Sequence, residues 1–156
     1  MKLTDFISKS AIIKELKSKD KKGAMSEIIE TMKGAYKVEK LKTSEILDSL
    51  IKREKIGSTG IGNSISVPHV KIDGIKTVVG AFGRSATGID FNAIDGEPVH
   101  LIFLILASTD DPDSNLQALR RIAQVAKQPN FCKFLREAKD ASEIMGLFRE
   151  LDEVLN

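Results

Sequence analysis

The chain has 156 residues, the usual size of one domain, and 42% of them are hydrophobic, so it can bury a core without disulfides or metal ions. Its 24 Lys and Arg nearly balance 22 Asp and Glu, which argues against a nucleic-acid-binding protein. One cysteine and two histidines exclude an intrachain disulfide and a Cys/His zinc site, so we expect no metal and no cofactor. The longest apolar run, Leu101 to Ala107, is too short to span a membrane, and residues 1–17 lack the apolar core of a signal peptide. We therefore expect a cytoplasmic protein that does not insert into the membrane.

The first part of the chain predicts one strand and two helices. Residues 11–16 form a short apolar run, which is typical of a strand. Apolar residues recur at helical spacing from Met25 to Tyr36 and predict the first helix. A second stripe covers residues 46–51, with Thr43 as its expected N-cap and Gly57 as its expected left-handed stop.

The second part predicts two long strands followed by helices. Residues 77–83 favour a strand with a bulge at Gly83, and residues 98–107 are apolar on both faces, which is typical of a central strand covered on two sides. Ser114 is the expected cap of the next helix, and two more helices follow over residues 131–138 and 144–155. The residues of the Ser114 helix expected to face inward are Leu116, Leu119, Ile122, Ala123 and Ala126. The sequence thus predicts an α/β fold with a mixed central sheet and helices on both faces, in three α/β/α layers.

A glycine-rich segment over residues 57–69 is the main candidate for chemistry, because long loops within compact domains are usually functional. Its spacing matches neither a P-loop nor a dinucleotide-binding fingerprint. It ends at Pro68-His69, where the proline restricts the backbone beside the imidazole, and a neutral imidazole is a good nucleophile near neutral pH. We therefore expect His69 to carry a phosphoryl group, with a structural histidine as the alternative. The loop residues whose backbone N–H groups could converge on an anion are Ser58, Thr59, Gly60, Gly62, Asn63 and Ser64.

Two other reactive side chains favour structural roles. His100 lies near the start of the buried strand, and we expect its ring to be satisfied by a hydrogen bond. Cys132 stands between Phe131 and Phe134, which favours a buried, inert thiol over a phosphocysteine.

The segment Arg53–Asn63 (REKIGSTGIGN), followed by Val67–His69 (VPH), resembles the active-site signature of the EIIA domains of the bacterial phosphotransferase system. The resemblance is to the fructose/mannitol type (type 2), which includes the nitrogen-regulatory EIIA proteins. It continues through Gly88–Phe91 (GIDF) and Asp95–Val99 (DGEPV) and covers essentially the whole chain. It implies a single EIIA domain over residues 1–156.

The resemblance also implies roles for individual residues. His69 matches the phosphorylated histidine, which would accept a phosphoryl group from an HPr-type carrier and pass it to a cysteine of an EIIB domain. Arg53 matches an arginine that can neutralise the transferring group, with a solvent-exposed helix-end cation as the alternative. We expect Ser58 and Thr59 to support the phosphate as well. Family members often carry a second histidine where this chain has Asn115. The amide of Asn115 can donate a hydrogen bond to a phosphate oxygen but cannot titrate. This difference is expected to affect the efficiency of onward phosphoryl transfer and not the acceptance of phosphate by His69.

The resemblance leaves three functions open. The chain can be a phosphohistidine carrier that links an HPr-type protein to an EIIB domain in sugar uptake. It can instead be a regulatory protein whose phosphorylation state controls binding to a target protein. A third alternative is a member that keeps the fold without the activity. The sequence identifies neither a sugar nor a target protein.

Overall fold

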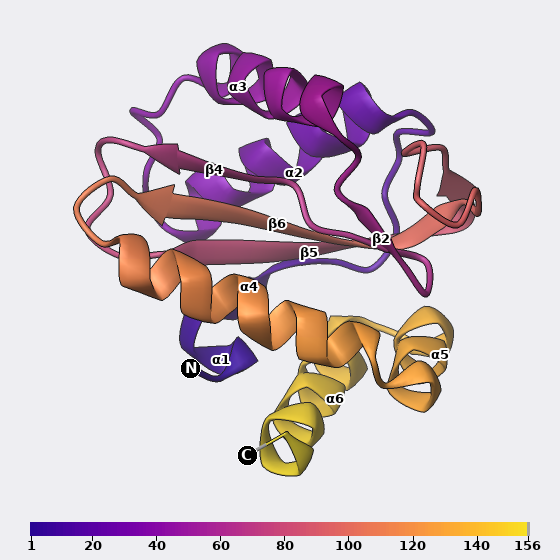
Figure 1. Cartoon of the computed structure of the whole chain (residues 1–156). Helices are drawn as coiled ribbons and strands as arrows, with labels where there is room; N and C mark the ends of the chain where they lie inside the picture. The colour runs from indigo at the N-terminus through magenta and orange to yellow at the C-terminus, as the bar shows by residue number, and fades with distance from the viewer. Residues whose placement is uncertain (156) are drawn as a thin grey trace.

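A computed structural model describes residues 1–155 and shows a mixed six-stranded sheet with helices on both faces (Figure 1). The predicted three-layer α/β/α fold is therefore confirmed. The strand order is β1-β5-β6-β3-β2. Strand β4 lies outside this order and also pairs with β6, further along that strand than β3 does. In chain order the elements are α1 (Leu3–Phe6), β1 (Ile7–Ile13), α2 (Lys21–Ala35), α3 (Thr43–Ile56), β2 (Gly60–Gly62), β3 (Ile65–Ser66), β4 (His69–Ile72), β5 (Val79–Ile89), β6 (Val99–Ser108), α4 (Pro112–Ala126), α5 (Pro129–Glu137) and α6 (Ala141–Val154).

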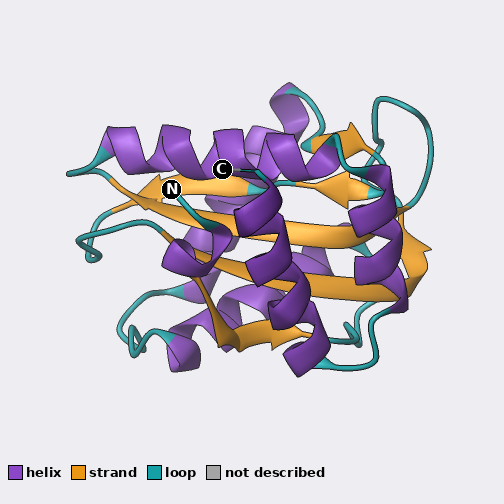
Figure 2. Cartoon of the chain, turned by 90° about the horizontal axis from the view of Figure 1, so that it is seen from below, coloured by secondary structure: helices purple, strands orange, loops and turns teal. Residues whose placement is uncertain are grey.

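Two hydrophobic cores lie on opposite faces of the sheet. Helices α2 and α3 cover one face, and α1, α4, α5 and α6 cover the other, which Figure 2 views from its helical side. Phe82 on β5 and Phe103 on β6 contact Phe148 on α6 in the second core, with ring centroids 5.0–5.9 Å apart. Both faces of the sheet are therefore covered by helices and removed from solvent.

Strand β6 is the centre of the fold, as its apolar sequence predicts. All ten of its residues are buried. It pairs antiparallel with β5 and parallel with β3 and β4. A segment joined to β6 is therefore held against the most buried strand of the protein.

The strand boundaries differ from the prediction. The first strand begins at Ile7 instead of residue 11, and β5 continues to Ile89 instead of ending at Gly83. The irregularity in β5 lies between Arg84 and Ile89, and Gly83 pairs regularly with β6. A Cβ atom at Gly83 would lie 3.0 Å from the Ile28 side chain, so close packing by α2 explains this glycine.

The predicted helix caps are also partly wrong. Lys42 is the N-cap of α3, and the hydroxyl of Thr43 instead bonds the Glu30 carboxylate on α2. Gly57 has φ of 172°, which is extended backbone and not a left-handed stop. The cap of α4 is Asp111, whose carboxylate accepts the backbone N–H of Ser114. Both N-caps thus come earlier in the chain than predicted, and of the two only Asp111 forms a side-chain cap bond.

Helix α4 buries only part of the predicted stripe. Ile122 and Ala126 are buried and Leu119 packs against the core, as predicted. Leu116 is 48% exposed and Ala123 is also exposed. Small and polar residues take part in the buried face, which a count of apolar residues does not detect. The buried residues of α4 are Ser114, Ala118, Arg121, Ile122, Val125 and Ala126.

Candidate active site

The glycine-rich segment is more ordered than a loop, because it contains a small hairpin. Strands β2 and β3 are antiparallel, and Asn63 and Ser64 between them have φ of 51° and 65°. A two-residue turn of type I′ requires positive φ at both central positions, and asparagine tolerates that region well. The residue types predicted to bind an anion therefore also build this turn.

Both residues of the hairpin turn bond to other parts of the fold. The carbonyl of Ser64 accepts the backbone N–H groups of His100 and Leu101, each at 2.9 Å. The side-chain amide of Asn63 donates to the carbonyl of Ala126, the last residue of α4. The hairpin thus ties the start of β6 to the end of α4, and the strand that follows leads into His69.

Glu54 in the last turn of α3 organises the start of this segment. Its side chain is 5% exposed and forms an ion pair of 2.9 Å with Lys21. Its carboxylate also accepts the backbone N–H of Thr59 at 3.3 Å and the Thr59 hydroxyl. Sequence reasoning missed this residue, although it stands next to Arg53 in the matched segment.

The two hydroxyls predicted to support phosphate already have partners within the protein. Thr59 is 3% exposed and donates its hydroxyl to Glu54. Ser58 donates to the carbonyl of Phe91 and accepts the backbone N–H of Gly60 at 3.0 Å. A phosphate oxygen would have to displace these bonds, so the contacts favour structural roles. Direct phosphate support by Ser58 and Thr59 stays a prediction.

His69 begins β4 and is held in a defined orientation. Its backbone is in parallel register with Ile105 of β6, and the carbonyl of Pro68 accepts the N–H of Ile105 at 2.9 Å. The half-buried ring places Nδ1 2.8 Å from the carbonyl oxygen of Val67. A carbonyl only accepts, so Nδ1 carries the proton in the neutral ring and Nε2 carries the lone pair. No hydrogen bond to Nε2 is present within residues 1–155.

Asn115 lies on the helix that covers the same face of the sheet. His69 is paired with Ile105, and neighbouring residues in a sheet project to one face, so its ring points to the face covered by α4. Asn115 shares a helical stripe with Leu119 and Ile122, which pack into the core on that face. Its Oδ1 is buried and has no hydrogen-bond donor within residues 1–155. The topology thus places the side chains of His69 and Asn115 in the layer between the sheet and α4.

Arg53 has a backbone partner of its own in this structure, and its role beside a phosphoryl group stays a prediction. It lies in the last turn of α3, on the opposite face of the sheet, and its Nη1 donates to the carbonyl of Gly57 at 2.7 Å. None of the hydrogen bonds within residues 1–155 joins Arg53 to His69. This geometry is that of a helix-end cation, and its remaining N–H groups are the ones that could meet a phosphate.

The sequence also matches a known protein family. The family model "Phosphoenolpyruvate-dependent sugar phosphotransferase system, EIIA 2" matches residues 5–151. The chain belongs to this family.

Individual relatives of the EIIA family agree. The chain is 34% identical over 147 residues to a nitrogen regulatory protein of Bradyrhizobium diazoefficiens, covering 94% of each chain. It is 31% identical to the fructose-specific EIIABC component of Bacillus subtilis, covering 98% of this chain but only 24% of that longer protein. The crystal structure of the nitrogen regulatory protein IIA-Ntr from Neisseria meningitidis superimposes with a TM-score of 0.79 at 26% identity, covering 94% of this chain and 98% of that one.

The remaining reactive side chains of this EIIA protein have the predicted structural roles. His100 is buried, and its Nδ1 lies 2.8 Å from the carbonyl of Ser85. Cys132 is buried as well, and burial raises the pKa of its thiol to about 11. The buried thiol stays protonated, and the His100 ring is only 9% exposed, so both environments favour the structural roles.

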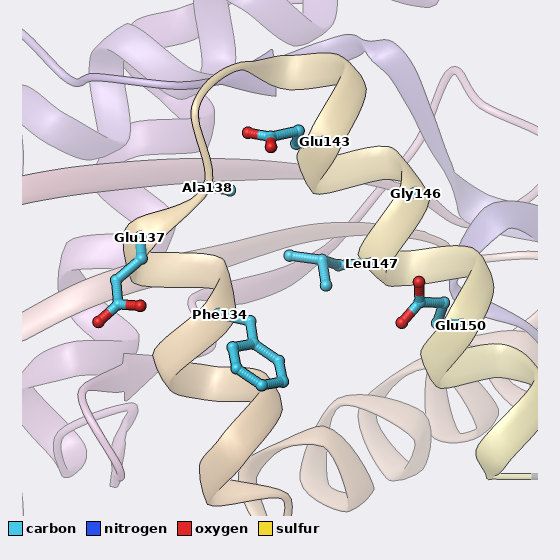
Figure 3. Close-up of a pocket in the computed structure, with 7 residues that line it drawn as sticks. All are labelled: Phe134, Glu137, Ala138, Glu143, Gly146, Leu147 and Glu150. Carbon is cyan, nitrogen blue, oxygen red and sulfur yellow. The ribbon is translucent and has the colours of Figure 1, made fainter.

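Three further observations concern metal ligands, membrane helices and a surface groove of this EIIA protein. No group of three metal-ligating side chains occurs within the described residues. None of the helices over residues 1–155 is long and apolar enough to cross a membrane. A groove of about 420 Å³ lies between α5 and α6, with Phe134 and Leu147 beside carboxylates (Figure 3). The carboxylates of the groove would repel a phosphoryl group, and they belong to Glu137, Glu143 and Glu150.

Proposed function

We propose that this EIIA domain is a phosphohistidine carrier that accepts a phosphoryl group on Nε2 of His69 from an HPr-type protein. The observation that supports this most directly is the Val67 carbonyl at Nδ1, which leaves the lone pair of the neutral ring on Nε2. The hairpin and β6 restrain the backbone around the ring, so little reorganisation is needed when a donor docks.

The transfer is a direct displacement at phosphorus. The lone pair of Nε2 forms the new N–P bond as the bond between phosphorus and the donor histidine breaks, and that electron pair returns to the donor ring. The imidazole of His69 gains positive charge while its Nδ1–H remains bonded to Val67, so the carbonyl oxygen stabilises the charge as it develops. Onward transfer to an EIIB cysteine is the same displacement with the thiolate as nucleophile.

Two side chains are proposed to assist the phosphoryl group. Arg53 would turn from the Gly57 carbonyl and offer its planar fork to two phosphoryl oxygens. Asn115 would donate one neutral hydrogen bond through its amide. Both proposals require these groups to move or turn toward the phosphoryl group on His69, and both are tested below.

A regulatory role is the second candidate, because the chain is similar in length and fold to nitrogen regulatory proteins. A phosphoryl group on His69 adds two negative charges to a half-buried surface position. Such a charge repels or recruits a target protein by local electrostatics. In this regulatory role the phosphorylation chemistry is the same. The difference is that a target protein, and not an EIIB domain, binds according to the phosphorylation state of His69.

The test is phosphorylation by phosphoenolpyruvate, enzyme I and an HPr-type protein. We expect one acid-labile, base-stable phosphate on His69, and no phosphate on the buried His100, which serves as internal control. His69→Ala should abolish the label while the circular dichroism spectrum is kept. Undiminished labelling of that variant would contradict the assignment. Mixing the labelled protein with an EIIB domain then separates the two roles, since only a carrier passes its label on.

A further inference from the structure

A cavity of about 440 Å³ opens between the end of β5, the start of β6 and helix α5. Three cationic side chains and one histidine line it beside a single carboxylate. His100 on β6 is five residues from Ile105, the partner of His69, which corresponds to about 16 Å along the strand. The lining residues are Arg84, Ser85, Ala86, His100, Lys133, Arg136 and Glu137.

The guanidinium of Arg84 is the unusual group in this cavity. It is only 9% exposed, and no carboxylate within residues 1–155 forms an ion pair with it. Its Nε donates to the carbonyl of Lys14 at 2.8 Å, and its Nη1 donates to carbonyls at the end of α5, including that of Leu135 at 2.9 Å. Carbonyl oxygens satisfy the donors but do not neutralise the charge, and buried charges are normally paired.

The surroundings increase the positive potential. Lys133 and Arg136 stand on the exposed side of α5 facing the cavity. Glu137 lines it too, and Glu15 lies nearby, where its carboxylate accepts the backbone N–H of Ala86 at 3.1 Å. Neither acid forms an ion pair with a lining cation in the described part of the chain. The neighbouring groove of Figure 3, on the α6 side of α5, has the opposite charge.

We infer that this cavity binds a small dianion, either a phosphate monoester or a dicarboxylate, with Arg84 supplying the buried counter-charge and Lys133 and Arg136 closing over it. The volume suits a small metabolite and not a macromolecule. Nε and Nη1 of Arg84 are bonded to backbone carbonyls, so Nη2 is the group that can donate to a carboxylate or phosphate oxygen. The site is distinct from His69 and does not depend on phosphoryl transfer.

The test is a titration of the full chain, at constant ionic strength, followed by backbone amide shifts in nuclear magnetic resonance. The probes are inorganic phosphate, glycerol 3-phosphate and succinate, with glycerol as the uncharged control. We expect a saturable shift centred on residues 84–86, 100 and 133–137. Saturation by the two phosphates alone identifies a phosphate site, and saturation by succinate alone identifies a dicarboxylate site.

Variants decide whether the cavity is responsible. Arg84 holds the end of α5, so its removal endangers the fold, and the exposed Lys133 and Arg136 are changed instead. The double variant Lys133→Gln/Arg136→Gln should weaken binding at least about tenfold. Arg149→Gln, an exposed change of the same kind on α6, should leave the affinity within about twofold. Shifts that stay linear to about 20 mM, shifts centred on residues 57–69, or equal affinities for both variants would overturn the proposal.

Discussion

Nδ1 of His69 lies 2.8 Å from the carbonyl oxygen of Val67, two residues earlier in the chain. Because Pro68 separates the two residues and has no N–H, the backbone between them offers the ring a carbonyl and no competing donor. The contact fixes both the tautomer and the direction of the ring. It is also local, so it survives small movements of the surrounding helices. In the proposed transfer, the nitrogen that acts as nucleophile would therefore be set by a three-residue segment, Val67-Pro68-His69.

Arg53 is the first residue to test. Arg53→Ala removes the charge and should slow transfer from a phosphorylated HPr-type donor on the order of a hundredfold. Arg53→Lys keeps the charge, so its transfer rate should fall by less. Rapid-quench measurement of transfer gives both rates. Urea unfolding serves as control, since loss of the Gly57 bond costs about 1 kcal/mol at most for a partly exposed pair. If both folded variants transfer as fast as the parent, Arg53 is a helix-end cation only.

Restoring the family histidine at Asn115 should accelerate transfer. A neutral amide bond contributes about 0.5–1.5 kcal/mol and a bond to a charged group about 1.5–3 kcal/mol, so Asn115→His should gain roughly tenfold in rate. The gain should grow from about pH 8 toward pH 6, because the introduced imidazole becomes positively charged as the pH falls. It should then be lost when His69 itself is protonated and no longer nucleophilic. Equal rates for parent and variant across this range would remove Asn115 from the mechanism.

Two glycines of the active-site segment form a matched pair. A Cβ atom at Gly60 would lie 2.7 Å from Cβ and 3.0 Å from Cα of Ala93, whereas one at Gly57 would meet nothing within 4 Å. Gly60→Ala should therefore displace the hairpin, lower the free energy of unfolding by about 1–3 kcal/mol and slow phosphorylation of His69. Gly57→Ala, in extended backbone, should change stability by about 0.5 kcal/mol or less. Chemical denaturation and the labelling rate check both, and equal behaviour of the two variants would contradict the packing argument.

The thiol of Cys132 should be nearly unreactive in the folded protein. Burial raises its pKa from 9.0 to about 11, so at mildly alkaline pH its thiolate fraction is about a hundredfold lower than in the unfolded chain. Ellman's reagent should react slowly with the native protein and quickly in urea. The unfolded chain releases this proton first, so the contribution of the group to stability falls as the pH rises from about 9 toward 11. Native and denatured rates that agree would show an accessible thiol.

Much of the fold follows from the sequence because the apolar pattern is strong. All residues of β6 are buried, and the continuous apolar run from Leu101 to Ala107 predicted this for most of the strand. The face of α4 was less predictable, since Ser114 and Ala118 contribute small side chains to the interface while Leu116 points to solvent. A pattern of apolar residues cannot distinguish a small residue selected for close packing from one on the surface.

The site was predictable only in part. Composition and spacing indicated His69, but they could not show that the glycine-rich segment forms a hairpin, because that depends on pairing with β6 far along the chain. They also assigned Ser58 and Thr59 to the phosphate, whereas both hydroxyls bond to partners in the fold. Glu54 and Asn63 act through such distant contacts, and only the matched segment hinted at them.

The most direct test of the account is the nitrogen to which the phosphoryl group is attached. The protein is labelled with nitrogen-15 in histidine, phosphorylated by an HPr-type donor, and examined through two-bond proton–nitrogen correlations of the imidazole rings. We predict a single modified ring, that of His69, with the phosphorus coupled to Nε2 and with Nδ1 still protonated toward Val67. Attachment to Nδ1, or to any other residue, would contradict the account.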